Sequence, residues 1–216
     1  MEIRERSRGR QADATAQRTR QRIVHSALAL FAARGYDGVS LRDIATHSDV
    51  THGLIRHHFG SKEDIWRAVI DTTFEEYLAM MTPLVEAAVT TNSGALATVK
   101  EVSRNAIVLT GSYPEVGRLL MHEGVEPGPR LDYFMARLAP LRTQMDPLIE
   151  SVQREGMLSQ FSHDTFLLAL IMLGVMPLAM AAFSDELCNV DILAPEQVEQ
   201  HADRVIATLF PEIARD

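Results

Sequence analysis

The segment VSLRDIATHSDVTHGLIRHHFGSKEDIW (39–66) contains several helix starts in quick succession, which strongly limits how the chain can fold. Ser40 with Asp43, and Ser61 with Asp64, have the capping-box spacing, in which a hydroxyl and a carboxylate satisfy free backbone N–H groups reciprocally. These pairs predict one short helix that starts at Ser40 and one long helix that starts at Ser61.

A further helix start lies between these two at Thr51, since threonine is a favoured N-cap residue. The turn between the first two helices is residues 46–49, which is too short for anything but the sharp corner of a helix-turn-helix. Asp49 is predicted to take a left-handed backbone conformation there, because aspartate tolerates it better than most residues.

The helix that starts at Thr51 can bury little apolar surface, since only Leu54 and Ile55 are clearly apolar in residues 51–58. Taken alone, this pattern is typical of a solvated surface helix. After a helix-turn-helix corner, such a helix instead suits the major groove of DNA, where polar side chains meet base edges and phosphates. A glycine there would let the backbone approach DNA closely. The residues of this helix that we predict to contact DNA are Thr51, His52, Gly53, Arg56 and His57.

Two further cationic features also indicate a nucleic-acid partner. Lys62 lies in the first turn of a helix, where the helix dipole disfavours a cation unless a phosphate is bound beside it. The arginines Arg4, Arg6, Arg8 and Arg10 form either a solvated tail or an arm that follows phosphates or enters the minor groove.

Charge divides the chain into a basic and an acidic part. Residues 1–66 carry 11 Lys+Arg and 8 Asp+Glu, whereas residues 67–216 carry 10 and 21. The net charge of -8 argues at face value against a nucleic-acid partner, but it is the sum of these unlike parts.

Helical periodicity is widespread and period-two alternation is scarce, so we predict an all-α fold. The first helix is expected from about Ala14 to Arg34, with Gly35 ending it, and the long helix from Ser61 to about Val89. Breaks follow at residues 90–94, 110–115, 123–129, near Gly156 and at 185–195, which gives about nine helices.

Residues 166–183 are uncharged throughout and reach the lower length limit of a membrane-spanning helix. Acidic flanks at Asp164, Asp185 and Glu186, with Pro177 inside the run, argue against a span. A helix buried on all sides in a core or a subunit interface is the favoured interpretation, so no membrane partner is predicted.

Catalytic motifs are absent from the sequence: it has no H-E-x-x-H pair, glycine-rich phosphate loop or nucleophile elbow. Cys188, the one cysteine, excludes an internal disulfide and fits a reducing compartment. We therefore expect no enzyme, no metal and no cofactor. The arginine-rich start lacks an apolar segment, so a cytoplasmic protein is expected.

The pattern R-I-x-x-S-A-L-x-L-F-x-x-x-G-Y-x-G-x-S-L-x-D-I-A, followed by V-T-x-G-L-I-x-x-H-F-G-S-K-E-D-I, spans Arg22 to Ile65. It resembles the N-terminal DNA-binding domain of the tetracycline-repressor (TetR) family of bacterial transcriptional regulators. The resemblance covers about a fifth of the chain. It implies a three-helix helix-turn-helix head, a connecting fourth helix, and a larger helical domain that binds an effector and dimerises through its last two long helices.

The predicted division is a disordered arginine-rich arm over 1–13, a helix-turn-helix DNA-binding domain over 14–60, and an effector-binding and dimerisation domain over 61–216. The resemblance further implies that Ser40, Arg42 and Lys62 contact phosphates and that His58 is mainly structural.

Two positions depart from the family pattern. The turn reads Ser48-Asp49-Val50-Thr51 where the family usually has Ala-Gly-Val-Ser, and Arg56 replaces a tyrosine that commonly contacts phosphate. An arginine can bind phosphate or read guanine.

The larger domain offers dimer and pocket candidates. Met172, Met176 and Met180 recur every four residues, which fits either core filling or an adaptable surface. The resemblance favours a dimer interface formed with the face of the last helix, as a four-helix contact. The predicted interface residues are Leu168, Met172, Met176, Met180, Val198, Ala202, Val205 and Leu209. The predicted effector-pocket residues are Phe74, Tyr77, Met81, Arg104, Met121, His122, Tyr133, Phe134 and Arg137, although each aromatic or methionine is more often a core residue.

The functional expectation is a homodimeric, ligand-responsive repressor that binds a pseudo-palindromic double-stranded DNA operator and an unknown small-molecule effector. An architectural DNA-binding protein without an effector is the alternative, and it predicts a solid larger domain without a pocket. A membrane-associated protein built on residues 166–183 is a second alternative.

Overall fold

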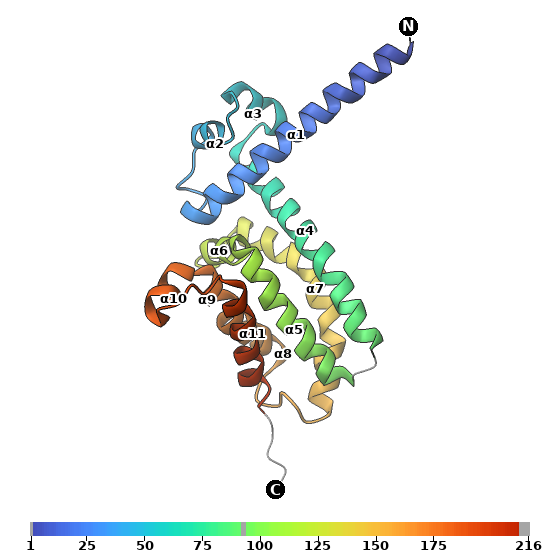
Figure 1. Ribbon diagram of the computed structural model, residues 1–216, viewed down its shortest axis with the longest axis vertical. Coiled ribbons are helices and arrows are strands. Elements are labelled where there is room, and N and C mark those ends of the chain that lie inside the picture. The colour runs from blue at the N-terminus through green and yellow to red at the C-terminus, as the bar shows by residue number, and fades with distance from the viewer. Residues whose placement is uncertain (1, 92–93, 212–216) are drawn as a thin grey trace. The chain divides into compact units, whose positions relative to one another are not determined.

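The computed structural model describes residues 2–91 and 94–211, and side chains from residue 14 onward (Figure 1). The regular secondary structure of these residues is helical, as predicted. The elements are α1 (Glu2–Arg34), α2 (Leu41–His47), α3 (His52–Phe59), α4 (Lys62–Thr90), α5 (Gly94–Ser112), α6 (Pro114–Glu123), α7 (Pro129–Arg154), α8 (His163–Leu170), a π-helical segment η1 (Ile171–Val175), α9 (Met176–Ala179), α10 (Ala181–Cys188) and α11 (Pro195–Leu209). They form two compact units, Met1–Thr73 and Phe74–Asp216.

The helix starts of the N-terminal unit are those that the sequence predicts. The backbone N–H of Asp43 donates to Ser40 Oγ at 3.1 Å, and the backbone N–H of Ser40 donates to Asp43 Oδ2 at 2.8 Å. The hydrogen bonds from Ser40 hold the pKa of Asp43 below its usual value. Ser61 and Asp64 make the same reciprocal pair at 3.2 and 3.1 Å. Both capping boxes are therefore present.

The corner between α2 and α3 is also formed as expected. Thr51 is the N-cap of α3 and accepts a hydrogen bond from the N–H of Leu54 at 3.3 Å. Asp49 has φ 50°, in the left-handed region. Ser48 is buried, and its hydroxyl donates to the carbonyl of Ile44 at 2.6 Å, which joins the turn to the end of α2. The turn is thus fixed by hydrogen bonds on both sides.

A small apolar core fixes the helices of the N-terminal unit. Its fully buried side chains come from α1, α2, α3 and α4, and they include Ile23, Phe31, Ile44, Ile55 and Trp66. Because α3 anchors itself through Ile55 and Phe59 alone, its remaining side chains are left at the surface.

The first helix is longer than the sequence predicts. It starts at Glu2 rather than near Ala14, so the backbone of residues 2–13, expected to be a disordered arm, is helical; Met1 lies outside the described residues. Arginine, glutamine, glutamate and alanine dominate this stretch and are good helix formers, which explains the extension.

The C-terminal unit is built around α5, which packs against α7 on one side and α11 on another (Figure 1). Helix α6 packs against α9. Gly174 of η1 permits the close contact of that segment with α5, because a Cβ there would lie 2.7 Å from a side-chain carbon of Ile107. Buried residues of α4, α5, α7, α8, α9 and α11 share one hydrophobic core.

The apolar run at 166–183 does not form one straight helix. It passes through α8, η1 and α9 and breaks at Met180, where the helix His163–Ala179 meets Ala181–Cys188 at 85°. Pro177, the second residue of α9, has no N–H to donate, which accounts for the irregular backbone hydrogen bonding before it. No single helix in the described ranges is long and apolar enough to cross a membrane, although this bent pair passes that test when taken together.

Candidate DNA-binding surface and ligand pocket

The predicted DNA-contacting residues lie at the surface of the N-terminal unit. His52, Arg56 and His57 of α3 are exposed, as are its N-cap Thr51 and Gly53. His52 and Arg56 are four residues apart and therefore share one face of the helix. Ser40 and Arg42, at the start of α2, are exposed as well. The exposed side chains of His52, Arg56, His57 and Arg42 can therefore contact another molecule.

The electrostatics of α3 suit an anionic partner. Its first turn contains no acidic residue, and Arg56, His57 and His58 lie in its last turn. Arg56 makes no ion pair with the described residues. A Cβ at Gly53 would meet nothing closer than Thr51 Oγ1 at 3.9 Å, so this glycine is not required by packing within the unit. The free N–H groups at the start of α3 and the Arg56 guanidinium in its last turn can each attract phosphate.

The two aromatic residues that end α3 support its position. Phe59 is buried, and the guanidinium of Arg20 lies over its ring at 4.5 Å from the centroid. His58 is half-buried beside it, with ring centroids 6.4 Å apart. His58 thus lies against the domain, whereas His57 is exposed.

Lys62 makes contacts within its own unit. Its Nζ donates to the carbonyl oxygens of Tyr36 and Val39, each at 2.9 Å, and lies 4.1 Å from the centre of the Tyr36 ring. The lysine therefore ties the start of α4 to the loop between α1 and α2. These contacts give Lys62 a structural role that the sequence did not predict, and its phosphate contact stays a prediction.

Replacing Lys62 with methionine is expected to lower the free energy of unfolding by about 1–3 kcal/mol, since two charge-assisted hydrogen bonds are lost. Urea denaturation of the full-length protein measures this free energy of unfolding. Arg67→Ala is the control, because it removes the same charge from an exposed side chain. Unchanged stability combined with weakened DNA binding would favour the phosphate role.

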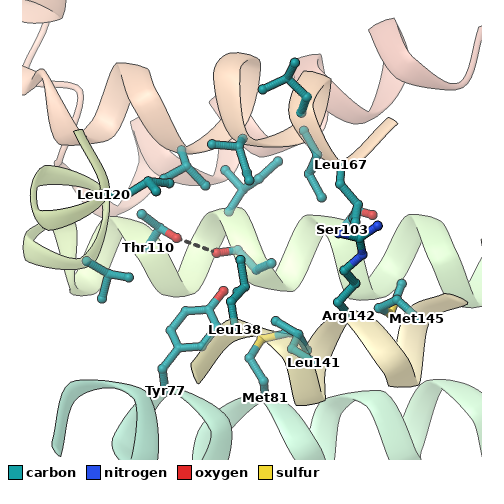
Figure 2. Close-up of a pocket in the computed structure, with 18 of the residues that line it drawn as sticks. Tyr77, Met81, Ser103, Thr110, Leu120, Leu138, Leu141, Arg142, Met145 and Leu167 are labelled. Atoms are coloured by element: carbon teal, nitrogen blue, oxygen red, sulfur yellow. Dashed lines mark hydrogen bonds between the residues drawn. The ribbon is translucent and has the colours of Figure 1, made fainter. Parts of the chain in front are cut away.

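The C-terminal unit contains a cavity of about 430 Å³. Figure 2 shows labelled side chains from α4, α5, α6, α7 and α8 pointing into this space. Of the predicted pocket residues, Phe74, Tyr77, Met81 and Phe134 line it. The rings of Phe74 and Phe134 meet edge to face, with centroids 4.9 Å apart. The pocket has the size of a small-molecule site.

Five predicted pocket residues do not line the cavity. Arg104 points outward and binds the carboxylates of Glu199 and Asp203 on α11, which raises the pKa of Arg104, chiefly through Asp203. Arg137 donates to Tyr133 Oη at 2.8 Å outside the cavity. Met121 and His122 also lie outside it. The error is one of helix phase: composition identified the segments but not which face points inward.

The sequence interpretation missed the polar groups of the cavity, which are Ser103 and Thr110 of α5, Arg142 of α7 and Asp164 of α8. Tyr77 hydrogen-bonds the Thr110 side chain, and burial raises the pKa of Tyr77 to about 12, so it is a neutral phenol at physiological pH. Ser103 and Thr110 are seven residues apart on α5, and this spacing places them on one helix face. That period is the signal that could have found them.

The predicted dimer face divides into two parts. Val198, Ala202, Val205 and Leu209 are buried in the core of their own unit, so they are not available to a second subunit. Their helix packs this face against α5, and this corrects that half of the prediction.

The remaining predicted interface residues include Leu168, Met172 and Met180, which are exposed. Together with other exposed residues of η1 and α10 they form a surface that we call the apolar stripe. These residues do not form the fully buried helix that the sequence predicts. Met176 is only partly exposed. The apolar stripe comprises Leu168, Met172, Leu173, Met180, Phe183 and Leu187, which are 41–70% exposed.

No group of three or more His, Cys, Asp or Glu side chains among the described residues could hold a metal ion. Cys188 is exposed at the end of α10.

Comparison with known proteins agrees with this geometry. The family model for bacterial regulatory proteins of the tetR family matches residues 23–69. The HTH-type transcriptional repressor Rv3405c of Mycobacterium tuberculosis is 49% identical over 49 residues, which are 23% of this chain and 26% of that protein. The chain thus spans about a quarter of the length of these curated relatives.

Similarity of structure extends much further along the chain. The hemolysin II transcriptional regulator HlyIIR superposes with a TM-score of 0.67 at 20% identity, covering 91% of this chain and 99% of that one. AibR, solved with isovaleryl coenzyme A and operator DNA, gives a TM-score of 0.69 at 18% identity, covering 90% and 100%. Residues 23–69 of this chain therefore match the tetR family of bacterial regulatory proteins, and the all-helical fold of the chain is shared with solved transcriptional regulators.

Proposed function

We propose that the protein is a sequence-specific DNA-binding transcriptional regulator, and more narrowly a ligand-responsive repressor that binds a pseudo-palindromic operator as a homodimer. The observation that carries the proposal is the short helix α3, anchored by Ile55 and Phe59, with His52, Arg56 and His57 exposed beyond a tight turn. This is the geometry in which a recognition helix enters the major groove.

The exposed residues divide into two roles. Thr51, His52, Arg56 and His57 would contact base edges and the adjacent phosphates, with Gly53 allowing close approach. Ser40 and Arg42, at the start of α2, would contact the phosphate backbone and fix the orientation of the domain on DNA. Lys62 also holds α4 against the loop before α2.

A change of Arg42 to alanine tests this assignment without any knowledge of the operator. Binding to a mixed-sequence duplex should weaken, and the slope of log K against log salt should become shallower by about 1 per subunit, because one phosphate contact is lost. Arg67→Ala removes the same charge from the side of α4 that pairs with Glu63, and it should leave the slope unchanged. An unaltered slope in Arg42→Ala, or wild-type protein that binds no duplex at low salt, would contradict the proposal.

Dimerisation is proposed through the apolar stripe. Exposed large apolar side chains are costly in water when they gather in one patch, so six of them on neighbouring segments of the chain favour a covered surface. A two-fold axis through the stripe would bring it against its own copy, as an isologous interface does. Leu168, Met172 and Met180 remain from the predicted interface, whereas Leu173, Phe183 and Leu187 are added.

The segment η1 connects the pocket with the apolar stripe. Ile171 and Val175 line the cavity, while Met172 and Leu173 are exposed on the stripe. Occupancy of the pocket would therefore act directly on the interface. To regulate, the ligand must favour one of two conformations, typically by about 1–3 kcal/mol.

The cavity distinguishes this proposal from an architectural DNA-binding protein, which would need only a solid second domain. AibR was solved with both a ligand and operator DNA, which supports a ligand-responsive mode for a chain with this fold.

A further inference from the structure

The walls of the cavity are apolar along its length. Phe74, Met81, Ile107, Phe134 and Met145 contribute side chains from α4, α5 and α7. Lining residues on α7 extend from Phe134 to Met145, a span of roughly 16 Å at the rise of an α-helix. A volume of about 430 Å³ lies in the lower part of the range of small-molecule sites, roughly 300–1,000 Å³. The cavity thus fits an elongated apolar molecule.

Ser103 is the polar group that lacks a partner. It is 1% exposed, and its Oγ makes no hydrogen bond with the described residues. Thr98 and Thr110, on the same helix, donate to the carbonyls of Gly94 and Ala106 at 3.0 and 2.8 Å, as helical hydroxyls commonly do. Buried hydroxyls are normally hydrogen-bonded, so the Ser103 donor is available to a ligand in the cavity.

The other polar groups of the cavity are already satisfied. The Thr110 hydroxyl donates to Ala106, so Tyr77 must donate to Thr110 in the hydrogen bond that joins them. Arg142 and Asp164 are the charged residues of the lining, and they pair with each other. An anionic ligand would have to displace the Asp164 carboxylate from Arg142, whereas a neutral ligand leaves this pair intact.

We propose that the pocket takes an uncharged, elongated apolar molecule with one hydrogen-bond-accepting oxygen, such as a ketone or ester, placed at Ser103. This inference rests on the proposed function only in treating the pocket as the effector site. The apolar chain would contact Phe74, Met81 and Phe134, and the Ser103 hydroxyl would donate to the oxygen.

Calorimetric titration of the full-length protein with tridecan-2-one and dodecanoate tests the inference, because the two probes have matched sizes. The ketone should bind, and dodecanoate should bind at least tenfold more weakly. Ser103→Ala should weaken ketone binding by about 2- to 10-fold, the worth of one hydrogen bond. Ser112→Ala is the matched control, since Ser112 is exposed on the same helix outside the lining.

Tighter binding of dodecanoate, lost in Arg142→Gln, would overturn the neutral-ligand inference in favour of an anionic one. Equal ketone affinity in Ser103→Ala and wild type would also overturn it, as would no binding of either probe. DNA binding by the same preparations is measured separately, so a failure of the ligand inference is distinguishable from a failure of the proposed regulator function.

Discussion

Replacing Arg56 with alanine is expected to weaken binding to a preferred operator by about 2–6 kcal/mol over two half-sites, or at least 30-fold. Arg56 is exposed on α3, makes no ion pair with the described residues, and shares a face with His52. If it reads guanine, the variant loses preference at one base pair of each half-site. If it binds phosphate, affinity falls uniformly across sequences.

Titration of both proteins with labelled duplexes, each carrying one changed base pair, separates these outcomes. Arg67→Ala serves as the control, because it removes the same charge from the N-terminal unit away from α2 and α3. Affinity that stays within twofold in Arg56→Ala would show that α3 does not face DNA in the assigned manner.

The second large effect concerns the apolar stripe. Changing both Met172 and Phe183 to aspartate should leave a folded monomer, because these side chains are 49% and 60% exposed within the subunit but would be buried in the dimer. Each interface would then contain unpaired buried carboxylates, which cost several kcal/mol. Sedimentation measures the oligomeric state, and operator affinity should fall more than 100-fold, since two half-sites are no longer held together.

Val125→Asp is the matched control for this prediction. Val125 is 77% exposed in the connection between α6 and α7, outside the apolar stripe, so its replacement should leave the dimer intact. A wild-type protein that is monomeric at micromolar concentration would contradict the proposed interface, as would a double variant that remains dimeric.

The N-terminal unit was predictable because its signals are local. A capping pair such as Ser40 with Asp43 forms within one turn of helix. The left-handed backbone conformation of Asp49 depends on the preference of that one residue. Lys62 is the exception: its partners, Tyr36 and Val39, are 26 and 23 residues away in sequence. The helix dipole argument could not anticipate these contacts.

The C-terminal unit was less predictable because several of its helices are apolar on more than one side. The face of α11 with Val198 and Ala202 was identified correctly as apolar, but its partner is α5 of the same subunit. The choice between core and interface depends on tertiary packing. Ser103 was missed for the related reason that its spacing from Thr110 marks one face of α5, but only tertiary packing decides that this face lines the cavity.

We expect two copies of α3 to recognise a two-fold symmetric DNA sequence. Selection of bound sequences from a random duplex pool by the full-length protein tests this recognition most directly. The prediction is an enriched pseudo-palindrome with half-sites about one helical turn, roughly 34–36 Å, apart. Enrichment that disappears in Arg56→Ala would support the assigned surface. A pool that remains random, or a site without two-fold symmetry, would contradict this expectation.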